Sequence, residues 1–229
     1  MISITRSLLQ LVYPHYCLGC GSDHLGLSQQ LCSRCIHQLP ETGFFGKMNN
    51  PVEKAFFGRI RVEQAGALYY FTKHSLVQEL MVQLKYRQNK HAGLFLGRMM
   101  GYALRSEPRF ADIDLLLPLP LNPKKEFKRG YNQAEVICEG IREVWSRPLK
   151  TQLLQREKFT DSQTTQNRLS RWQNMEGVFK ISASEQLIDK HVLLVDDVIT
   201  TGATLEACGQ TLMSIPNCRL SLAAAAYTL

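Results

Sequence analysis

The stretch from Val192 to Leu205 constrains the fold of this 229-residue chain more than any other part of its sequence. It reads as a continuous apolar strand that ends in two adjacent carboxylates, Asp196 and Asp197, followed by a short loop and by a helix that Gly202 opens. In open α/β sheets, ligands bind beyond the carboxyl ends of the parallel strands. An apolar strand that leads into a helix in this way predicts an α/β domain with its ligand site at this loop.

The loop after this strand has the composition of a phosphate-binding turn. Backbone N–H groups at a helix N-terminus attract anions, and neighbouring hydroxyl groups add hydrogen bonds. The predicted phosphate-binding residues are Thr200, Thr201, Gly202, Ala203 and Thr204. Because carboxylates repel phosphate, Asp196 and Asp197 are expected to face sugar hydroxyls or a Mg²⁺ ion. The pattern predicts recognition of a sugar phosphate, with Asp197 and Gly202 outside the core; the alternative is a Thr-capped helix beside an acidic loop.

Other segments show the alternation of strands and helices that a parallel sheet needs. Strands are predicted at 65–71, 115–117, 191–195 and 220–227, and helices at 75–86, 92–104, 131–145 and 202–214. Apolar strands that alternate with helices indicate a parallel sheet covered by helices on both faces.

Four of the seven cysteines form two Cys-x-x-Cys pairs near the start of the chain. The predicted metal ligands are Cys17, Cys20, Cys32 and Cys35. Two such knuckles direct four thiolates to one point, which suits tetrahedral Zn²⁺, and four thiolates leave no open position for catalysis. The alternatives are two disulfides or a redox pair. We expect an amphipathic helix and a zinc ribbon in residues 1–40, a linker at 41–62 that is rich in glycine and asparagine, and the larger domain at 63–229.

The charge balance favours an anionic partner. The chain has 27 Lys and Arg residues against 20 Asp and Glu residues, a net charge of +7. Such an excess suits nucleic acid, a phosphorylated metabolite or an acidic surface, and does not choose among them. The sequence has no apolar run long enough to span a membrane and no signal-peptide pattern, so a cytoplasmic protein is expected.

In their order along the chain, these motifs resemble a known family. Val192–Leu205 resembles the phosphoribosyl-diphosphate (PRPP) signature of type I phosphoribosyltransferases, and Arg129–Gln133 resembles the Arg-Gly-Phe-Asn-Gln motif of the ComF/GntX family, with Tyr131 in the aromatic place. Lys85–Arg87 resembles that family's basic segment after its first helix. The whole chain is similar to these competence and DNA-utilisation proteins, which join a zinc ribbon to a phosphoribosyltransferase-like domain.

The resemblance implies a type I phosphoribosyltransferase-like parallel sheet flanked by helices, with a small N-terminal zinc ribbon. It implies that Asp196 and Asp197, as catalytic residues, hold the ribose hydroxyls of PRPP or a nucleotide while the loop holds the 5′-phosphate. It also implies a polar hood at 156–179; by its composition alone, this polar stretch is either a lid or binding loop or a solvated surface excursion. The hood residues at the family's spacing include Arg156, Gln163, Arg171 and Asn174.

A cation cluster precedes the Arg-Gly-Tyr-Asn-Gln motif. Its members are Lys124, Lys125, Lys128 and Arg129. They suit a Mg²⁺-bound diphosphate, a single-stranded DNA backbone or a solvated loop. If the protein is active, the reaction is displacement of diphosphate from ribose C1 by a nitrogen nucleophile, but the sequence leaves turnover open. The rival hypothesis is a non-catalytic factor that binds DNA or DNA-processing proteins and uses the fold as a ligand sensor or scaffold.

Overall fold

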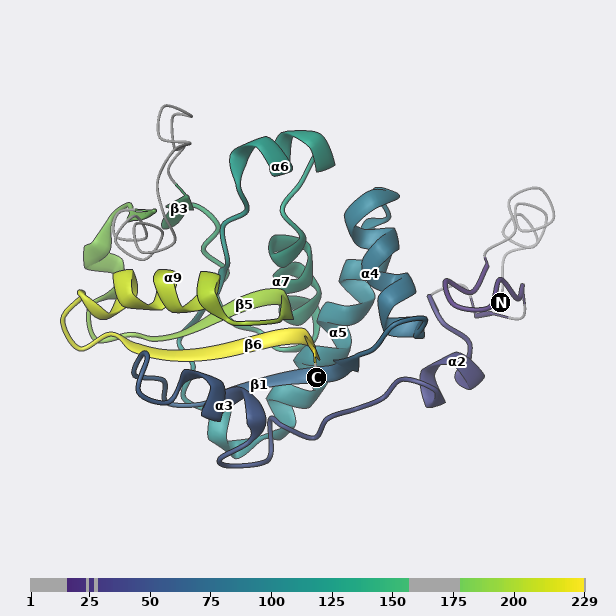
Figure 1. Ribbon diagram of the computed structural model, residues 1–229, viewed down its shortest axis with the longest axis horizontal. Helices are drawn as coiled ribbons and strands as arrows, with labels where there is room; N and C mark the ends of the chain where they lie inside the picture. Colours follow the sequence, from purple (N-terminus) through teal and green to yellow (C-terminus); the bar gives the residue numbers. More distant parts are fainter. Residues whose placement is uncertain (1–15, 24, 27–28, 157–177, 229) are drawn as a thin grey trace, which may run out of the picture.

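A computed structural model describes residues 16–228 except 24, 27–28 and 157–177 (Figure 1). Its centre is a four-stranded parallel sheet in the order β1-β6-β5-β2. The strands are β1 (Ala65–Phe71), β2 (Leu115–Pro118), β5 (His191–Ile199) and β6 (Arg219–Thr228). A small antiparallel pair, β3 (Leu154–Arg156) and β4 (Phe179–Ile181), lies beside the main sheet. The predicted parallel sheet is therefore confirmed.

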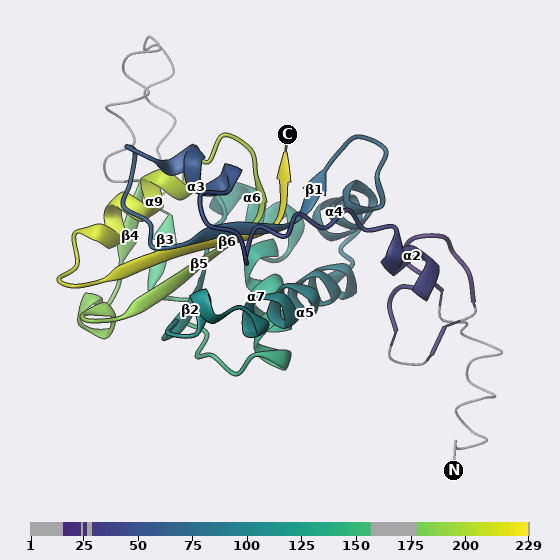
Figure 2. The same cartoon turned by 90° about the horizontal axis from the view of Figure 1, so that it is seen from below.

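Helices cover both faces of the sheet, as Figure 2 shows from below. The helices on one face are α4 (Leu76–Tyr86), α5 (Lys90–Ser106) and α7 (Gln133–Val144), and those on the other are α3 (Pro51–Phe56) and α9 (Ala203–Met213). Along β5, Leu193 and Val195 pack on the first face, whereas Val192 and Leu194 pack on the second. Burial on both faces explains why the stretch Val192–Val195 of this strand is apolar at every position.

Short elements complete the described part of the chain. They are α2 (Ser33–His37), η1 (Pro108–Phe110), α6 (Pro123–Arg129) and η2 (Ser184–Leu187). None of the helices that the structure describes is long and apolar enough to cross a membrane.

Side-chain caps set the start of the helices that lead to the site. The Ser75 hydroxyl accepts a hydrogen bond from the Gln78 N–H at the start of α4, and Asn132 accepts one from the Ala134 N–H at the start of α7. Such caps satisfy amides that have no partner inside the helix. The predicted helix at 75–86 therefore begins directly after its cap Ser75, and the predicted helix at 131–145 begins directly after its cap Asn132.

β5 runs further than the sequence predicts. We expected the strand to end at Asp196 and Asp197, but Val198 and Ile199 continue its pairing with Ala226 and Tyr227 of β6. The reason is that β6 extends to Thr228 and offers a partner for these two β-branched residues. The two carboxylates therefore lie within the strand, on its rigid hydrogen-bonded part.

The segment 41–62, expected to be a linker, packs into the core of the α/β domain. It contains α3, and its side chains Phe44, Val52 and Phe56 are buried with residues of the sheet. Just before and at its start, Pro40 and Thr42 hydrogen-bond with the edge of β1 through backbone groups. This burial removes the freedom that a linker has between two domains.

Candidate functional site

A cavity of about 200 Å³ lies at the carboxyl end of β5. Two acidic side chains of β5, Asp196 and Asp197, line it together with Thr204 of α9. Cationic side chains from α4, α6 and β3 also line it: Lys85, Lys125, Arg129 and Arg156. The fold thus brings together charged groups that are far apart in the sequence.

The sheet creates this opening because the edge strand β2 is shorter than its neighbour β5. β2 ends at Pro118, which pairs with Val195, and the Leu119 N–H donates a 2.8 Å hydrogen bond to the Val195 carbonyl. Beyond that point β5 continues along β6 alone, through Asp196 and the residues that follow. The missing neighbour leaves space beside the two carboxylates, at the edge of the sheet where α/β proteins bind ligands.

Asp197 has a cationic partner. Lys85 Nζ lies 2.9 Å from Asp197 Oδ1, and the two side chains are 22% and 14% exposed. The backbone N–H of Asp197 also donates a 2.7 Å hydrogen bond to Asp196 Oδ1. Lys85 therefore reduces the negative charge of a pair of neighbouring acids and fixes the orientation of one of them.

Asp196 is perturbed by its surroundings. Desolvation of its carboxyl group, together with the neighbouring Asp197 charge, raises the pKa of Asp196 to about 7. A cation or a hydroxyl donor that binds beside the carboxyl group favours its ionised form. A ligand of this kind would therefore lower the pKa of Asp196.

The predicted phosphate-binding residues separate into two groups. Thr204 lines the cavity, whereas the Thr200 and Thr201 side chains are exposed and are not among the lining residues. Gly202 is the N-cap of α9 with φ 74°, and the Thr201 Oγ1 accepts a 3.4 Å hydrogen bond from the N–H of Ala203, the first residue of the helix. Thr204 thus brings the first turn of α9 to the cavity wall, and backbone amides at a helix N-terminus favour anions.

The prediction that Gly202 lies outside the core is wrong. Gly202 is buried, and a Cβ atom at this position would lie 2.7 Å from Cζ of Phe56. The residue is a glycine because its φ is left-handed and because an aromatic ring occupies the space of a side chain. Asp197 is partly buried at the cavity wall and was also predicted outside the core.

Sequence reasoning missed the residues that support this loop from behind. The Arg59 guanidinium donates hydrogen bonds to the Thr201 carbonyl at 3.0 Å and to Glu206 Oε2 at 3.0 Å. Glu206 is buried in the first turn of α9. Its negative charge would weaken the binding of an anion at the N-terminus of this helix, and the positive charge of Arg59 compensates for it. Nothing local in the sequence could have shown a pair that is 147 residues apart.

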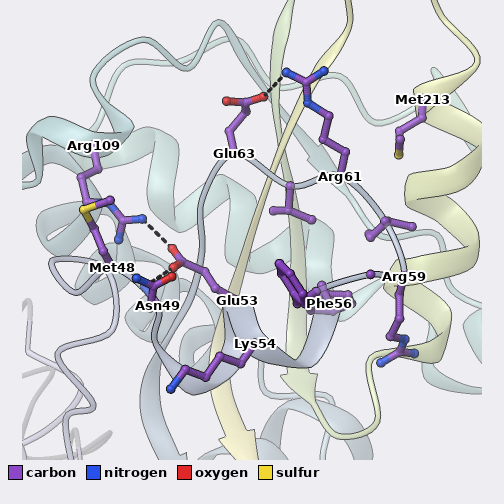
Figure 3. A pocket seen from close by; sticks show the side chains of 14 residues that line it. Met48, Asn49, Glu53, Lys54, Phe56, Arg59, Arg61, Glu63, Arg109 and Met213 are labelled. Atoms are coloured by element: carbon purple, nitrogen blue, oxygen red, sulfur yellow. Dashed lines mark hydrogen bonds and ion pairs between the residues drawn. The ribbon is translucent and has the colours of Figure 1, made fainter.

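A second cavity, of about 640 Å³, lies behind this support. Figure 3 shows Phe56 and Arg59 among its lining side chains, with Arg109 in an ion pair with Glu53. Phe56 and Arg59 are thus shared between this cavity and the back of the loop before α9. Arg109, one of the cations that line this second cavity, already has Glu53 as its ion-pair partner.

The predicted cation cluster forms α6, a helix with no buried residue. Lys125 and Arg129 line the first cavity, whereas Lys124 and Lys128 are exposed and do not line it. The Arg129 guanidinium lies 5.6 Å from the centre of the Tyr86 ring at the end of α4. The phenyl ring of Phe127 is 93% exposed on the same helix, although the sequence analysis did not select it.

Only the two ends of the predicted hood are described. Arg156 ends β3, lines the cavity, and lies 5.6 Å from the centre of the Phe179 ring in β4. Its burial lowers the pKa of the Arg156 guanidinium. The other predicted hood residues, Gln163, Arg171 and Asn174, lie outside the described residues.

The four predicted zinc ligands meet in space. The sulfur atoms of Cys17, Cys20, Cys32 and Cys35 all lie within 4.8 Å of one another. Cys20 Sγ and Cys32 Sγ are 3.7 Å apart, close to the separation of about 3.8 Å that tetrahedral Zn–S bonds of about 2.3 Å give. All four are free cysteines, so the two disulfides of the alternative hypothesis are not formed. The cluster can hold one structural zinc ion.

Comparisons with known proteins agree with this arrangement. Residues 132–227 match the family model described as a phosphoribosyl transferase domain. The chain is 28% identical to competence protein F of Haemophilus influenzae, over 87% of this chain and 79% of that protein. It is 24% identical to the DNA utilization protein YhgH of Escherichia coli (strain K12), over 58% of this chain and 60% of that protein.

A further relative is the competence protein ComFC of Bacillus subtilis. It is 33% identical over 43% of this chain and 38% of its own length. Among solved structures, the allosteric regulatory enzyme of purine biosynthesis aligns with 59% of this chain and 26% of its own at 18% identity and a TM-score of 0.41, an overlap too limited to inform the site. The sheet, the matched domain and the cysteine cluster together confirm the predicted fold class.

Proposed function

This chain is related to the ComF family of competence and DNA-utilisation proteins, and on that premise we propose that it binds PRPP or another ribose 5-phosphate ligand. The names of two relatives refer to competence and to DNA utilization. We further propose that this chain acts in natural transformation or in the use of external DNA. The ligand site of this proposal is the cavity at the carboxyl end of β5.

One observation carries the proposal: the cavity joins two carboxylates to the N-terminal turn of a helix and to four cations. In this assignment Asp196 and Asp197 accept hydrogen bonds from the ribose hydroxyls. The 5′-phosphate lies against the amides before Thr204. Lys125 and Arg129 contact the diphosphate, because charge-assisted hydrogen bonds from such groups are the strong ones.

Lys85 has a separate role in this assignment. A diphosphate and two ionised acids would repel one another inside one small cavity. The 2.9 Å contact between Lys85 and Asp197 removes part of that repulsion before the ligand arrives. When Mg²⁺ is bound with the diphosphate, it supplies further positive charge to the leaving group.

The same arrangement could support transfer. Displacement of diphosphate from ribose C1 needs the sugar held in one orientation and the leaving group held by cations. Asp196 and Asp197 would orient the sugar, and Lys125 and Arg129 would hold the leaving group. The proposal itself is one of binding, and turnover is a separate question that diphosphate release answers.

The experiment that tests the proposal is a titration of the purified full chain with ribose 5-phosphate, PRPP and a nucleoside monophosphate, each with Mg²⁺. The proposal expects saturable binding of at least one of them, with PRPP strongest because it alone uses the cations of α6. Absence of binding to all three would contradict it. Incubation with PRPP and each nucleobase, followed by a diphosphate assay, reports transfer.

A second candidate function has an observation of its own. α6 presents Phe127 beside Lys124, Lys128 and Arg129, and Tyr86 lies next to it with 71% of its side chain exposed. Exposed aromatic rings between cations are the features by which proteins stack on and neutralise single-stranded nucleic acid. We propose binding of single-stranded DNA along α6 as the alternative, at the mouth of the ribose phosphate cavity.

A further inference from the structure

The first Cys-x-x-Cys turn, Cys17–Cys20, is called the zinc knuckle below. It is hydrogen-bonded to α4, the helix that carries Lys85. The backbone carbonyl of Leu18, between Cys17 and Cys20, accepts a 2.8 Å hydrogen bond from Nε2 of Gln83 in α4. Gln83 is only 7% exposed, so the amide of its side chain is sheltered from water. A buried polar group of this kind costs free energy when its partner is lost. The contact is therefore a specific link between the two parts.

The other end of the Gln83 side chain secures the end of α4. Its Oε1 accepts a 2.9 Å hydrogen bond from Nδ2 of Asn89, and its backbone carbonyl accepts hydrogen bonds from the N–H groups of Arg87 and Asn89 at 3.2 Å. Lys85 lies inside this last turn, two residues after Gln83. The turn that Gln83 holds is thus the one from which Lys85 reaches Asp197.

A packing contact joins the knuckle to the other end of the same helix. Gly19 lies so close to α4 that a Cβ atom there would be 2.8 Å from Cδ1 of Leu76 and 2.9 Å from Sγ of Cys35. Leu76 is the first residue of α4. The knuckle therefore contacts α4 in its first turn and in its last, which fixes both the position and the rotation of the helix.

We propose that Gln83 is a positioning residue through which the zinc knuckle holds Lys85 against Asp197. The inference rests on the proposed function, since the site that it serves is the ribose phosphate cavity. It gives the zinc module a role in ligand binding in addition to its own folding. A zinc ion held by the four cysteines would fix Cys17 and Cys20, and with them the Leu18 carbonyl between them.

The geometry explains why such positioning matters. A lysine side chain has four rotatable bonds and is fixed poorly by its own packing. Its 2.9 Å contact with Asp197 therefore depends on the place and orientation of the last turn of α4, from which the side chain starts. An α4 that shifts releases Lys85, and the two acids then oppose the diphosphate without compensation.

The test replaces Gln83 with methionine in the zinc-loaded full chain, because methionine keeps the length of the side chain and loses its three hydrogen bonds, to Leu18, Glu79 and Asn89. Gln78→Met on the same helix is the control, since the Gln78 amide oxygen bonds only the nearby His74 N–H. Metal analysis and PRPP·Mg²⁺ calorimetry are performed on both. We expect an unchanged zinc content in both variants, and about tenfold weaker PRPP binding in Gln83→Met alone.

A double-mutant cycle separates positioning from general damage. If Gln83 acts through Lys85, then Gln83→Met added to Lys85→Met has no further effect on PRPP affinity. Additive losses, or equal affinity in Gln83→Met and wild type, would overturn the proposal.

A second measurement needs no ligand, so it separates this inference from the proposed function. Hydrogen–deuterium exchange of the last turn of α4 should become faster in Gln83→Met and stay unchanged in Gln78→Met. A wild type that binds no ribose phosphate would end the proposed function. Exchange that is equal in Gln83→Met and wild type would end the positioning role, whatever the wild type binds.

Discussion

Lys85 Nζ and Asp197 Oδ1 are 2.9 Å apart, although 112 residues separate them in the sequence. The contact joins the last turn of α4 to the part of β5 that extends beyond β2. It places a cation on one of two adjacent acids at the wall of the candidate site.

Replacing Lys85 with glutamine should weaken the binding of PRPP·Mg²⁺ by about tenfold, since loss of one charge-assisted hydrogen bond costs about 1.5 kcal/mol or more. The neutral side chain no longer balances Asp197, so the diphosphate meets a more negative cavity. Lys47→Gln, an exposed lysine away from the site, is the control. Calorimetry that gives the same affinity for both variants would contradict the assignment of Lys85.

The stability of the ligand-free protein should depend on pH through Asp196. The folded pKa of about 7 lies above the unfolded value of about 3.9, so the native state favours the protonated carboxyl group. That contribution is fully present below about pH 4 and is lost as the pH rises to about 7. Asp196→Asn cannot ionise and avoids this loss.

We therefore expect the unfolding free energy of Asp196→Asn to rise relative to wild type between pH 4 and pH 8, by on the order of 1–3 kcal/mol. Asp189→Asn is the control, because Asp189 is exposed and asparagine tolerates its left-handed φ of 57°. Chemical denaturation at several pH values measures the difference. A constant difference across this range would show that Asp196 is not perturbed.

Much of the fold was predictable because its signals are local. The apolar run in β5, the helical spacing in α4 and α7, and the paired cysteines each occupy one short stretch of sequence. The supports of the site were not predictable in this way. Arg59 and Glu206 come together only in the folded chain. The last residues of β5 are in the strand because β6 extends beside them, and the sequence of β5 alone does not show how far β6 extends.

Zinc binding should stabilise more than the cysteine cluster. Cys17 and Cys35 are buried in the same core as Val77, Leu80 and Leu84 of α4. Cys17→Ser should lose the ion and lower the melting temperature of the whole chain, because metal binding contributes to folding free energy. Cys218→Ser, outside the cluster, is the control. Metal analysis that finds no zinc in the wild type would contradict this expectation.

Gly202→Ala should destabilise the fold itself, so it cannot serve as a pure test of phosphate binding. The alanine must adopt φ 74° and must displace the Phe56 ring, which lies 2.7 Å from its Cβ position. Gly43→Ala isolates the first cost, since Gly43 has φ 68° and open space around a Cβ. We expect Gly43→Ala to cost about 1 kcal/mol and Gly202→Ala clearly more. Equal losses of unfolding free energy would show that Phe56 moves without cost.

If α6 binds single-stranded DNA, its affinity should fall steeply with salt. The triple variant Lys124→Ala/Lys125→Ala/Arg129→Ala should reduce the slope of log K against log salt by about 2, at about 0.7 for each lost phosphate contact. Phe127→Ala should weaken binding with little change in slope, because stacking is not ionic. Phe57→Ala, an equally exposed ring elsewhere, is the control. Fluorescence anisotropy with a labelled oligonucleotide measures both effects, and an unchanged slope in the triple variant would exclude α6 as the contact.

The central claim is that a ribose 5-phosphate group binds at the carboxyl end of β5, and calorimetry of PRPP·Mg²⁺ with wild type and Asp197→Asn tests it most directly. Asparagine keeps the size of the side chain and removes the charge that pairs with Lys85 and that, in our proposal, accepts hydrogen bonds from the ribose hydroxyls. We predict saturable one-site binding to wild type and an affinity roughly ten to a hundred times lower in Asp197→Asn. Equal affinity in the two proteins, or no binding to wild type, would contradict it.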